Sequence, residues 1–352
     1  MNKKVAIILV NYKDYARRFL ADCVASIRSQ DYDGERKIFL VDNESTDESY
    51  NYLKDQAAEA QIIRNKNNDG FAKGNNDAIK LALKQGFEYI ILFNMDTVLE
   101  PSCIREMVAV AESDKKIGAV QARLMLYNNK NKINSLGNVT HFLGLGYSLG
   151  HNEEFSISNF QFSIKDICYP SGAAVLYTKE ALEKVGLFDE EFWMYNEDQD
   201  LGWRIWLAGY RCVLAGRAVA YHKYEFSRSI KNYYWMDRNR IIAMLKNYHF
   251  YSLILIIPAS IVMEMGLLFF TFKNGWFKGK MRVYKYFLSI KNWRYIMAER
   301  KKINSLRRAK DKDIIKLFSG RIWYQEIGEW KLKVANIMFG TYWKIIKILI
   351  RW

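Results

Sequence analysis

Apolar stretches alternate with helical patterns over the first 120 residues of the chain. Between the stretches, apolar residues recur every three to four positions, as at Phe19, Cys23 and Ile27, and this spacing predicts amphipathic helices. The apolar stretches themselves are typical of buried strands and lie at residues 5–10, 37–41, 61–64, 89–93 and 118–122. Strands and helices that alternate in this way build a doubly wound, mainly parallel sheet. The pattern therefore predicts an α/β fold.

The pattern changes twice between residues 120 and 250. Residues 127–164 are rich in Asn, Ser and Gly, which predicts loops and short strands covering one face of the sheet. A second ordered block follows. It consists of a predicted loop and strand at 168–177, helices at 179–185 and 197–208, and a pair of strands within 211–221.

The last hundred residues differ in composition from the rest. Residues 250–272 are strongly apolar and long enough to span a bilayer, but Pro258 and Glu264 stand near their middle. Because proline removes a helical hydrogen bond, we expect the helix to break at Pro258. A weaker amphipathic stretch, with basic residues among aromatic and aliphatic ones, covers residues 334–352.

The net charge of +15 is concentrated in one segment. Residues 273–312 hold fourteen Lys and Arg against only Glu299 and Asp311, which leaves about +3 for the rest of the chain. A charge of this size raises nucleic acid as a partner. Its confinement to a segment that follows an apolar stretch favours an anionic membrane surface instead.

The four cysteines argue for a reducing compartment. Cys23, Cys103, Cys168 and Cys212 lie far apart, which speaks against a structural zinc site and against a disulfide-stapled domain. The apolar run after Lys4 is too short for a secretory signal. We therefore expect the protein on the cytosolic side.

Short polar side chains follow the predicted strands, where an open α/β sheet binds its ligands. They include Val10-Asn11-Tyr12 after the first strand and Asp42-Asn43 after the second. Each polar residue could cap the next helix or contact a ligand. A glycine-containing turn with Gly70, Lys73 and Asn75 precedes the next helix but lacks the dinucleotide and Walker spacings. Asn94 and Asp96 follow the strand at 89–93.

Taken in order, these motifs resemble the inverting family 2 glycosyltransferases with the GT-A fold, in particular their rhamnosyltransferase-like branch. The first half of the resemblance consists of Val10-Asn11-Tyr12, Val41-Asp42-Asn43-x-Ser45-x-Asp47, Asn68-x-Gly70-Phe71-Ala72-x-Gly74-Asn75-Asn76 and Asn94-x-Asp96. The second half consists of Ser171-Gly172-Ala173-Ala174, Gly186-Leu187-Phe188-Asp189-Glu190-x-Phe192, Tyr195-x-Glu197-Asp198-x-Asp200-Leu201-x-x-Arg204 and His222. The resemblance covers residues 4 to about 247.

The resemblance implies a nucleotide-sugar donor, with dTDP or UDP as its nucleotide, and a divalent metal, Mn²⁺ or Mg²⁺. A metal ion would stabilise the charge that grows on the leaving diphosphate. Asp96 is the expected ligand, with His222 as a second; a lone His at a strand end also has a structural reading. The family often has an aspartate at the first motif position, where this chain has Asn94.

The resemblance assigns Asp198 as the base that removes the acceptor proton, as an inverting transfer requires. Glu197, Asp200 and Arg204 are the expected acceptor contacts, although acids at a helix N-terminus are also favoured by the helix dipole alone. Trp193 and Tyr195 could stack on sugar rings or serve as core residues.

The resemblance implies three regions: a donor half (1–125) and an acceptor half (126–247) of one GT-A domain, and a helical, basic, membrane-associating region (248–352). Because the donor is cytosolic and the basic segment should also lie inside, one membrane crossing would separate them. We expect a monotopic arrangement at the cytoplasmic face, with basic residues such as Arg300 and Arg307 at lipid head groups, which suits a lipid-linked saccharide acceptor. The alternative is a soluble domain whose core contains both apolar helices.

Two other function classes remain open. A nucleotidyltransferase shares a nucleotide-binding α/β sheet and an acidic metal site, but it needs a basic triphosphate loop near the first strand. A non-enzymatic protein could use the basic segment to bind membranes or nucleic acid, and the salt dependence of binding to vesicles and to nucleic acid separates those partners.

Overall fold

The computed structural model describes residues 3–156, 164–224, 232–323 and 329–352, which group into two compact units. The first unit comprises residues 3–138, 148–205 and 210–224 of those described, and the second comprises residues 139–147 and 206–209 with the described residues from 232 onward. The helix α7 (Tyr233–Asn247) therefore groups with the C-terminal helices. The predicted division at residue 247 stays a prediction.

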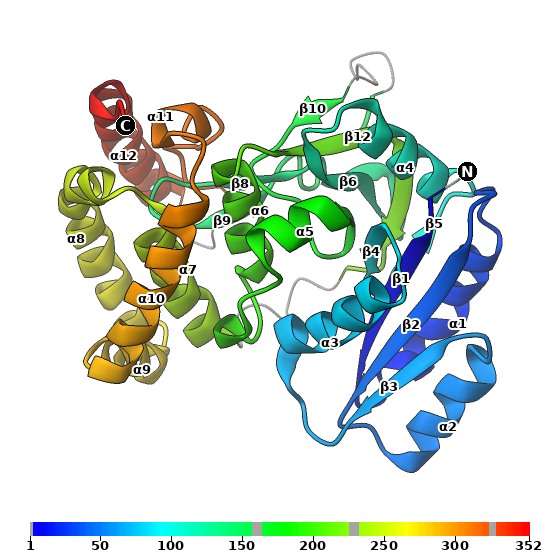
Figure 1. The fold of residues 1–352 in the computed structure, drawn as a ribbon. Coiled ribbons are helices and arrows are strands. Elements are labelled where there is room, and N and C mark those ends of the chain that lie inside the picture. The colour runs from blue at the N-terminus through cyan, green and yellow to red at the C-terminus, as the bar shows by residue number, and fades with distance from the viewer. Residues whose placement is uncertain (1–2, 157–163, 225–231, 324–328) are drawn as a thin grey trace. The chain divides into compact units, whose positions relative to one another are not determined.

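The first unit is built on one mixed sheet (Figure 1). Along the sheet the described strands follow the order β10-β12-β6-β11-β4-β1-β2-β3, with β5 beside β12 and β7 beside β6. Their bounds are β1 (Val5–Tyr12), β2 (Arg36–Asn43), β3 (Gln61–Asn65), β4 (Tyr89–Phe93), β5 (Thr97–Leu99), β6 (Ile117–Leu126), β7 (Asn129–Ser135), β10 (Lys165–Asp166), β11 (Ala174–Thr178) and β12 (Arg211–His222).

Strand direction within the sheet confirms the predicted fold class. Strands β3, β2, β1 and β4 are parallel, so their carboxyl ends share one edge. Strand β11 runs antiparallel between β4 and β6, and β12 is parallel to β6. The mainly parallel, doubly wound sheet is thus present, with β11 inserted antiparallel and with β5, β7 and β10 antiparallel to their neighbours.

Alternating side chains of the strands divide between two faces of the sheet. Val5, Ile7 and Leu9 of β1 join a large buried cluster with apolar residues of helices α1 and α4, whereas α3 packs against β1 and β2. The helices of the first unit are α1 (Tyr15–Arg28), α2 (Asp47–Gln56), α3 (Gly70–Lys84), α4 (Cys103–Ser113), α5 (Lys179–Val185), the 3-10 turn η2 (Glu190–Phe192) and α6 (Glu197–Leu207), whose last residues group with the second unit.

Local sequence signals explain where several of these helices begin. Thr46 and Thr178 each accept a hydrogen bond from the backbone N–H of the third residue of the following helix, at 3.1 and 3.3 Å. They therefore cap α2 and α5. Gly186, with φ +80°, ends α5. These caps position the loops that carry the functional motifs.

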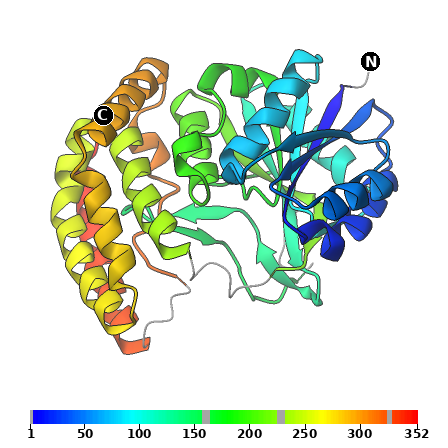
Figure 2. The same ribbon diagram turned by 90° about the horizontal axis from the view of Figure 1, so that it is seen from below.

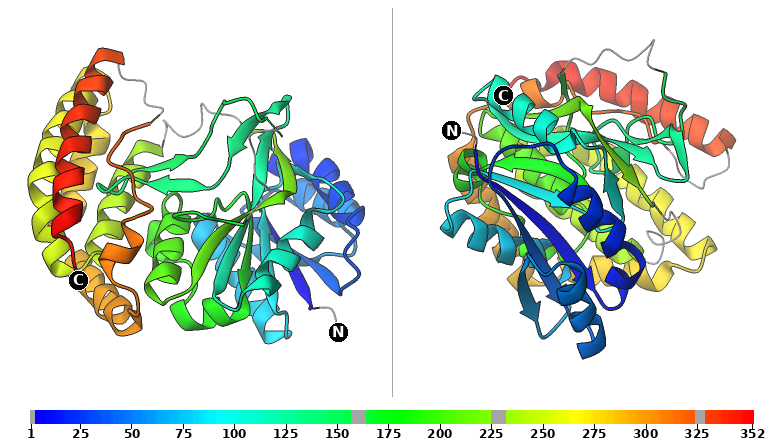
Figure 3. Two further views of the ribbon diagram at one scale, coloured as in Figure 1. Left: turned by 90° about the horizontal axis from the view of Figure 1, so that it is seen from above. Right: turned by 90° about the vertical axis from the view of Figure 1, so that its right-hand side faces the viewer.

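The second unit is helical, with a short hairpin of β8 (Asn138–Thr140) and β9 (Gly146–Ser148). Its other helices are α8 (Phe250–Lys273), α9 (Phe277–Phe287), α10 (Ile290–Leu306), α11 (Asp311–Ile314) and α12 (Glu329–Leu349). Figures 2 and 3 show α8 and α12 side by side. Asp311 accepts hydrogen bonds from the N–H of His249 and the hydroxyl of Ser252, at 2.8 and 2.6 Å, and so caps the start of α8 from outside.

Two predictions about secondary structure were wrong. Residues 211–222 form one long strand with an irregularity between Ala215 and Val219, and not a pair of strands. Helix α8 does not break at Pro258. Next to the carbonyl that the proline leaves without a helical donor, the hydroxyl of Tyr342 in α12 donates to the carbonyl of Leu255 at 2.7 Å, so tertiary contacts support the helix there.

Candidate active site

Asp96 stands just beyond the carboxyl end of β4 and is buried. Its Oδ2 accepts a hydrogen bond from the hydroxyl of Tyr15 at 2.5 Å, and its Oδ1 lies 3.2 Å from Nε2 of His222. On the other side of the imidazole, Nδ1 lies 2.9 Å from Oδ1 of Asn134. Four elements, β4, α1, β12 and β7, thus bring one carboxylate and one imidazole together.

The surroundings keep Asp96 ionised. Burial by itself raises the pKa of this carboxyl, but the hydrogen bond and charge of His222, together with the Tyr15 hydroxyl, bring it below its ordinary value. A carboxylate that stays ionised is suited to a cation.

Asp96 and His222 fit a divalent ion held mainly by its substrate. Nδ1 of His222 lies beside Asn134 and Nε2 lies beside Oδ1 of Asp96, so Nε2 and Oδ1 could both face one ion. Among the described residues no group of three or more His, Cys, Asp and Glu side chains gathers as a metal site. Mg²⁺ is commonly held by one or two carboxylates with substrate phosphates and water, so such a site needs few protein ligands.

Asn94 lies at the junction between β4 and the 171–174 loop. Its N–H donates to the carbonyl of Ala173 at 3.0 Å, and its carbonyl accepts from Thr97. These are backbone contacts, and they fix the start of the Asn94-Met95-Asp96 turn.

The ends of β1 and β2 carry a buried polar network. Nδ2 of Asn11 donates to Asp42 Oδ1 at 2.9 Å, and Oδ1 of Asn11 accepts the N–H of Ala16 at 3.0 Å at the start of α1. Asp42 also accepts from the Ser45 hydroxyl at 2.6 Å. Val10 is half-buried and Tyr12 is exposed at the same edge. Asn11 therefore serves as a helix anchor, and Asp42 as its partner.

Gly70 is the first residue of α3, at the end of the turn that follows β3. Nδ2 of Asn43 donates to the Gly70 carbonyl at 3.2 Å, and a Cβ on Gly74 would come within 3.0 Å of Nδ2 of Asn43. Lys73 pairs with Asp69 and Asp77 at 3.0 and 2.8 Å. A Cβ on Gly74 would therefore require the Asn43 side chain to shift by a few tenths of an ångström.

Asn75 is buried within α3. Its side chain donates to the carbonyl of Phe71 at 2.8 Å, one turn earlier in the same helix. Donor binding by Lys73 and Asn75 stays a prediction.

Glu197 and Asp198 begin α6 in different environments. The buried Glu197 has an Oε2 atom without a hydrogen-bond partner among the described residues, and burial followed by the charge of Asp198 raises its pKa well above the ordinary value. Burial raises the pKa of Asp198 to about 6, while the N–H groups of Gln199 and Gly172, at 2.8 and 3.4 Å, favour its charged form. The two acids therefore differ in their hydrogen bonds: backbone N–H groups reach Asp198, and none of the described residues reaches Oε2 of Glu197.

The loop at residues 171–173 links the turn that carries Asp96 to the start of α6. Gly172 donates to Asp198, and the next residue, Ala173, accepts from Asn94. The N–H of Ser171 donates to Oε1 of Gln121 at 2.7 Å, which fixes the loop to β6. The turn that carries Asp96 and the helix that carries Asp198 are thus joined through two consecutive residues, Gly172 and Ala173.

The segment before Glu197 is strained. Trp193, Tyr195 and Asn196 have φ of 58°, 68° and 64°, a region that residues other than glycine seldom adopt. The Trp193 carbonyl accepts the N–H of Ala72 at 3.1 Å, and its indole N–H donates to the carbonyl of Asn68 at 3.4 Å. This segment, residues 193–196, therefore clamps the turn around Gly70. Such strain tends to gather at functional sites.

Asp200 and Arg204 form a buried ion pair one helical turn apart. Nε of Arg204 donates to Asp200 at 2.9 Å, and its terminal nitrogens donate to the carbonyls of Val185 and Leu187 at 2.7 and 2.8 Å. The pair holds the loop after α5 in place. Acceptor contacts by Asp200, Arg204, Trp193 or Tyr195 stay predictions.

Sequence reasoning missed three side chains of this site. Tyr15, Asn134 and Gln121 position Asp96, His222 and the 171–173 loop, respectively. Tyr15 follows the first strand by three residues, so a search for phenols near strand ends would have found it. Asn134 and Gln121 contact groups far away in the sequence, His222 and the N–H of Ser171, and no local pattern indicates them.

Known proteins resemble this chain in sequence and in fold. The family model described as glycosyl transferase family 2 matches residues 6–186, about half of the chain. The poly-beta-1,6-N-acetyl-D-glucosamine synthase of Staphylococcus epidermidis is 24% identical over 204 residues, covering 57% of this chain and 45% of that protein. An N-acetylglucosaminyltransferase of Mesorhizobium japonicum is 26% identical over 228 residues, covering 61% and 50%. The chain thus spans about half the length of these curated relatives.

Solved structures share the fold. A crystal structure of S. aureus TarS residues 1-349 with UDP superposes with a TM-score of 0.51 at 14% identity, covering 98% of this chain and 90% of that one. A structure of GalNAc-T7 with UDP, GalNAc and Mn²⁺ gives a TM-score of 0.52 at 14% identity, covering 63% and 43%. At this identity the likeness concerns the fold, which confirms the GT-A-like prediction. With the family match, it excludes the two rival classes, and the chain belongs to glycosyl transferase family 2.

Proposed function

We propose that this family 2 enzyme is an inverting, metal-dependent glycosyltransferase that moves a sugar from a nucleotide-sugar onto a lipid-linked glycan at the cytoplasmic face of the membrane. The observation that carries the proposal is the link between Asp198 and the Asp96 turn through residues 171–173. An inverting transfer needs a base and a site that neutralises the diphosphate, at fixed positions relative to each other. The link supports the proposal because it connects the proposed base to the proposed metal ligand.

Asp198 is the proposed base. Its pKa of about 6 is low enough for the carboxylate to be ionised at neutral pH and high enough to accept a proton from a hydroxyl in the transition state. Neighbouring Glu197, with its raised pKa, adds little negative charge that would oppose the carboxylate. We assign Glu197 to a hydrogen bond with an acceptor hydroxyl, because its Oε2 has no other partner in the described part of the chain.

Asp96 and His222 are the proposed protein ligands of a divalent ion, which when bound would stabilise the charge on the leaving diphosphate. Tyr15 and Asn134 hold these two ligands in place through hydrogen bonds of 2.5 and 2.9 Å. The end of β2, with Asp42 and Asn43, and the turn at Gly70 would bind the nucleotide at the carboxyl edge of the sheet.

The donor sugar separates two candidates. The motif resemblance favours rhamnose from dTDP-rhamnose, whereas the names of the curated relatives favour N-acetylglucosamine from a UDP donor. Both would serve the synthesis of a cell-surface polysaccharide. Turnover of the purified protein with a panel of dTDP-, UDP- and GDP-sugars, in the presence of Mn²⁺ or Mg²⁺, decides between them.

The Asp198→Asn variant tests the role of the base. We expect nucleotide binding to stay within about twofold of the original protein, while transfer falls by about 10²–10⁴-fold, the usual contribution of general base catalysis. Glu191→Gln, which changes a nearby acid outside this cluster, is the control and should retain transfer. Transfer that survives Asp198→Asn would remove Asp198 as the base.

A further inference from the structure

Helix α8 carries a straight apolar stripe that faces solvent along its whole length. Among the described residues α8 is the one helix long and apolar enough to cross a membrane, yet little of it is buried in the fold. The exposed positions recur every three to four residues, which places them on one side of the helix. They are Phe250, Ile254, Ile257, Ile261, Met265, Phe269 and Phe272. The opposite side, with Ser252, Ile256, Ala259 and Met263, is buried.

The stripe continues over neighbouring helices of the second unit. In α12 the exposed apolar residues again recur at helical spacing, and a third group lies at the corner between α9 and α10. The residues of α12 are Trp330, Val334, Ile337, Met338, Ile345, Ile348 and Leu349, and those of the corner are Leu288, Ile290, Trp293 and Met297. Exposed apolar surface of this extent is rare on soluble proteins and marks an interaction surface.

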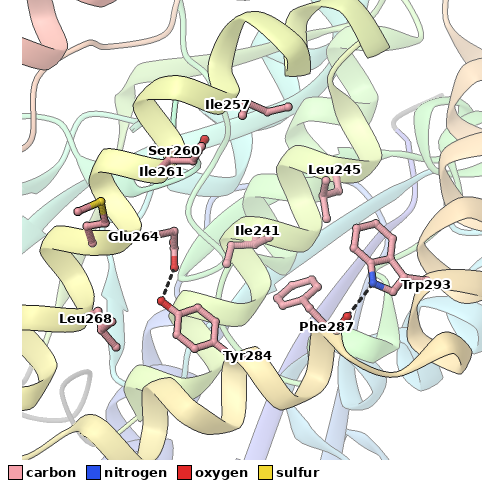
Figure 4. A pocket seen from close by; sticks show the side chains of 11 residues that line it. Ile241, Leu245, Ile257, Ser260, Ile261, Glu264, Leu268, Tyr284, Phe287 and Trp293 are labelled. Carbon is pink, nitrogen blue, oxygen red and sulfur yellow. Dashed lines mark hydrogen bonds between the residues drawn. The ribbon is translucent and has the colours of Figure 1, made fainter.

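A groove of about 640 Å³ joins the α8 stripe to the α9–α10 corner (Figure 4). It is lined by α7 (Ile241, Leu245), by α8 (Ile257, Ile261, Leu268) and by the rings of Tyr284, Phe287 and Trp293. The polar atoms of this lining bond with one another: the Tyr284 hydroxyl donates to Glu264 at 3.3 Å, and the Trp293 indole N–H donates to the carbonyl of Phe287 at 2.7 Å. The groove therefore presents mainly hydrocarbon.

Glu264, the one acid of α8, is held by partners on both neighbouring helices. It accepts hydrogen bonds from Arg240 of α7 and, at 2.5 Å, from Lys280 of α9, and both of these cations also pair with Asp237 at 2.7 Å. Although burial raises the pKa of Asp237, the charges of Arg240 and Lys280 keep it below its ordinary value. Two acids and two bases thus fasten the middle of α8 to α7 and α9.

This cluster decides how α8 can meet a bilayer. A helix that crossed would take α9 with it into the hydrocarbon, along with the exposed side chains Lys278, Arg282 and Lys285. A helix that lies in the plane of the interface buries its exposed stripe in the acyl chains and leaves α9 at the head groups.

Charge identifies the occupant as an anionic lipid surface. Exposed lysines and arginines border the apolar corner, at Lys291 and Arg294 of α10, and α12 carries Lys331 and Lys344 beside its stripe. A second copy of this chain docked on the same face would bring like charges together, whereas anionic head groups complement them.

We propose that α8, α12 and the α9–α10 corner form one surface that inserts in plane into the cytoplasmic leaflet of an anionic bilayer, with lipid hydrocarbon in the groove. The inference rests on the proposed function in one respect, the lipid-linked acceptor. Membrane binding itself is measured without any sugar donor. An unsubstituted chain that turns over a sugar donor but does not bind vesicles would overturn this inference alone. An unsubstituted chain that binds vesicles but turns over no sugar donor would overturn the proposed function alone.

Flotation with vesicles tests the surface. We expect the full chain to bind phosphatidylcholine vesicles that contain 30% phosphatidylglycerol, and the doubly substituted Ile261→Asp, Met265→Asp protein to bind at least tenfold more weakly, with an unchanged thermal melt. Ile164→Asp, an exposed isoleucine of the first unit, is the matched control and should bind as the unsubstituted chain does. A dimer that the double substitution dissociates, with vesicle binding unaffected, would show that a second copy covers the face instead.

Cysteine labelling tests the in-plane orientation. All four native cysteines are buried, so a membrane-impermeant maleimide should report mainly on introduced ones. Lys54→Cys before α8 and Lys278→Cys after it are both at exposed positions. In sealed membrane vesicles of one orientation, both sites should label from the same side. Labelling from opposite sides would mean that α8 spans the membrane and would overturn the proposal.

Discussion

At the residue scale, Glu197 and Asp198 show how neighbouring buried acids acquire different chemistry from the hydrogen bonds that they receive. Glu197 is enclosed without a hydrogen-bond donor to one of its oxygens in the described structure, whereas Asp198 receives two backbone N–H groups. Each donor favours the charged form of Asp198 and limits the effect of burial. The base could be chosen from the sequence only through the family motif, because helix dipole arguments apply equally to both acids.

The pKa of Asp198 predicts the pH dependence of transfer. The base works in its ionised form, so kcat/KM should be level above about pH 7 and should fall about tenfold for each pH unit below the pKa of about 6. A pH series of kcat/KM for the sugar donor and acceptor measures this limb. A limb that remains at the same pH in the residual activity of Asp198→Asn would assign it to another group.

The pair of Asp96 and His222 predicts how metal affinity responds to substitution. Asp96→Ala should abolish the metal dependence of nucleotide binding. Asn134→Ala should lower the affinity for the metal by about 10–100-fold, because His222 loses the partner of its Nδ1. Calorimetric titration of nucleotide at several Mn²⁺ concentrations measures both effects. Asp31→Ala, which removes an exposed ion pair with Arg105, is the control. Equal metal dependence in Asp96→Ala and the original protein would refute the assignment.

At the scale of elements, residues 193–196 connect the turn at Gly70 to the start of α6. The start of α3 lies directly against the Trp193 carbonyl and indole, and Gly70 has φ +81° at the contact. A Cβ at Gly70 would come within 2.5 Å of Trp193. The glycine is therefore needed both for its conformation and for the close approach.

Gly70→Ala and Gly86→Ala separate these two requirements. Gly86 has nearly the same backbone, φ +85°, but nothing within 4 Å of an added Cβ. We expect Gly86→Ala to lower the free energy of unfolding by about 1–2 kcal/mol, because alanine is strained in the left-handed conformation. Gly70→Ala should lower it by more and should also raise KM for the donor. Denaturant unfolding and donor kinetics measure both. Adding Trp193→Ala to Gly70→Ala should recover part of the stability, and no recovery would mean that the strain lies elsewhere.

Elements with local signals were predicted well, and those set by distant contacts were not. The parallel strands and the helices after them follow from apolar spacing, which depends on near neighbours in the chain. The antiparallel placement of β11 between β4 and β6 depends on pairing across more than fifty residues. Arg300 and Arg307, which we expected at lipid head groups, instead donate to the carbonyls of Leu245 and Asn247, and this could not be read from their charge.

At the scale of the whole molecule, charge and apolar surface collect in the second unit while the acidic functional residues collect in the first. This division explains why the net charge of +15 says little about the chemistry. The segment at 273–312 still contains most of the excess charge, but Lys280 and Arg300 are buried within the fold. The positive surface that remains is what a membrane or another partner would meet.

The left-handed residues before Glu197 have a consequence for engineering this enzyme. Glycine or asparagine at Tyr195 would relieve backbone strain, so a screen for thermostable variants would select such changes early. The same changes would make the backbone between the turn at Gly70 and Asp198 more flexible. Variants chosen for heat resistance alone would therefore gain stability while losing turnover, and a stability screen of this family member should exclude positions 193–196.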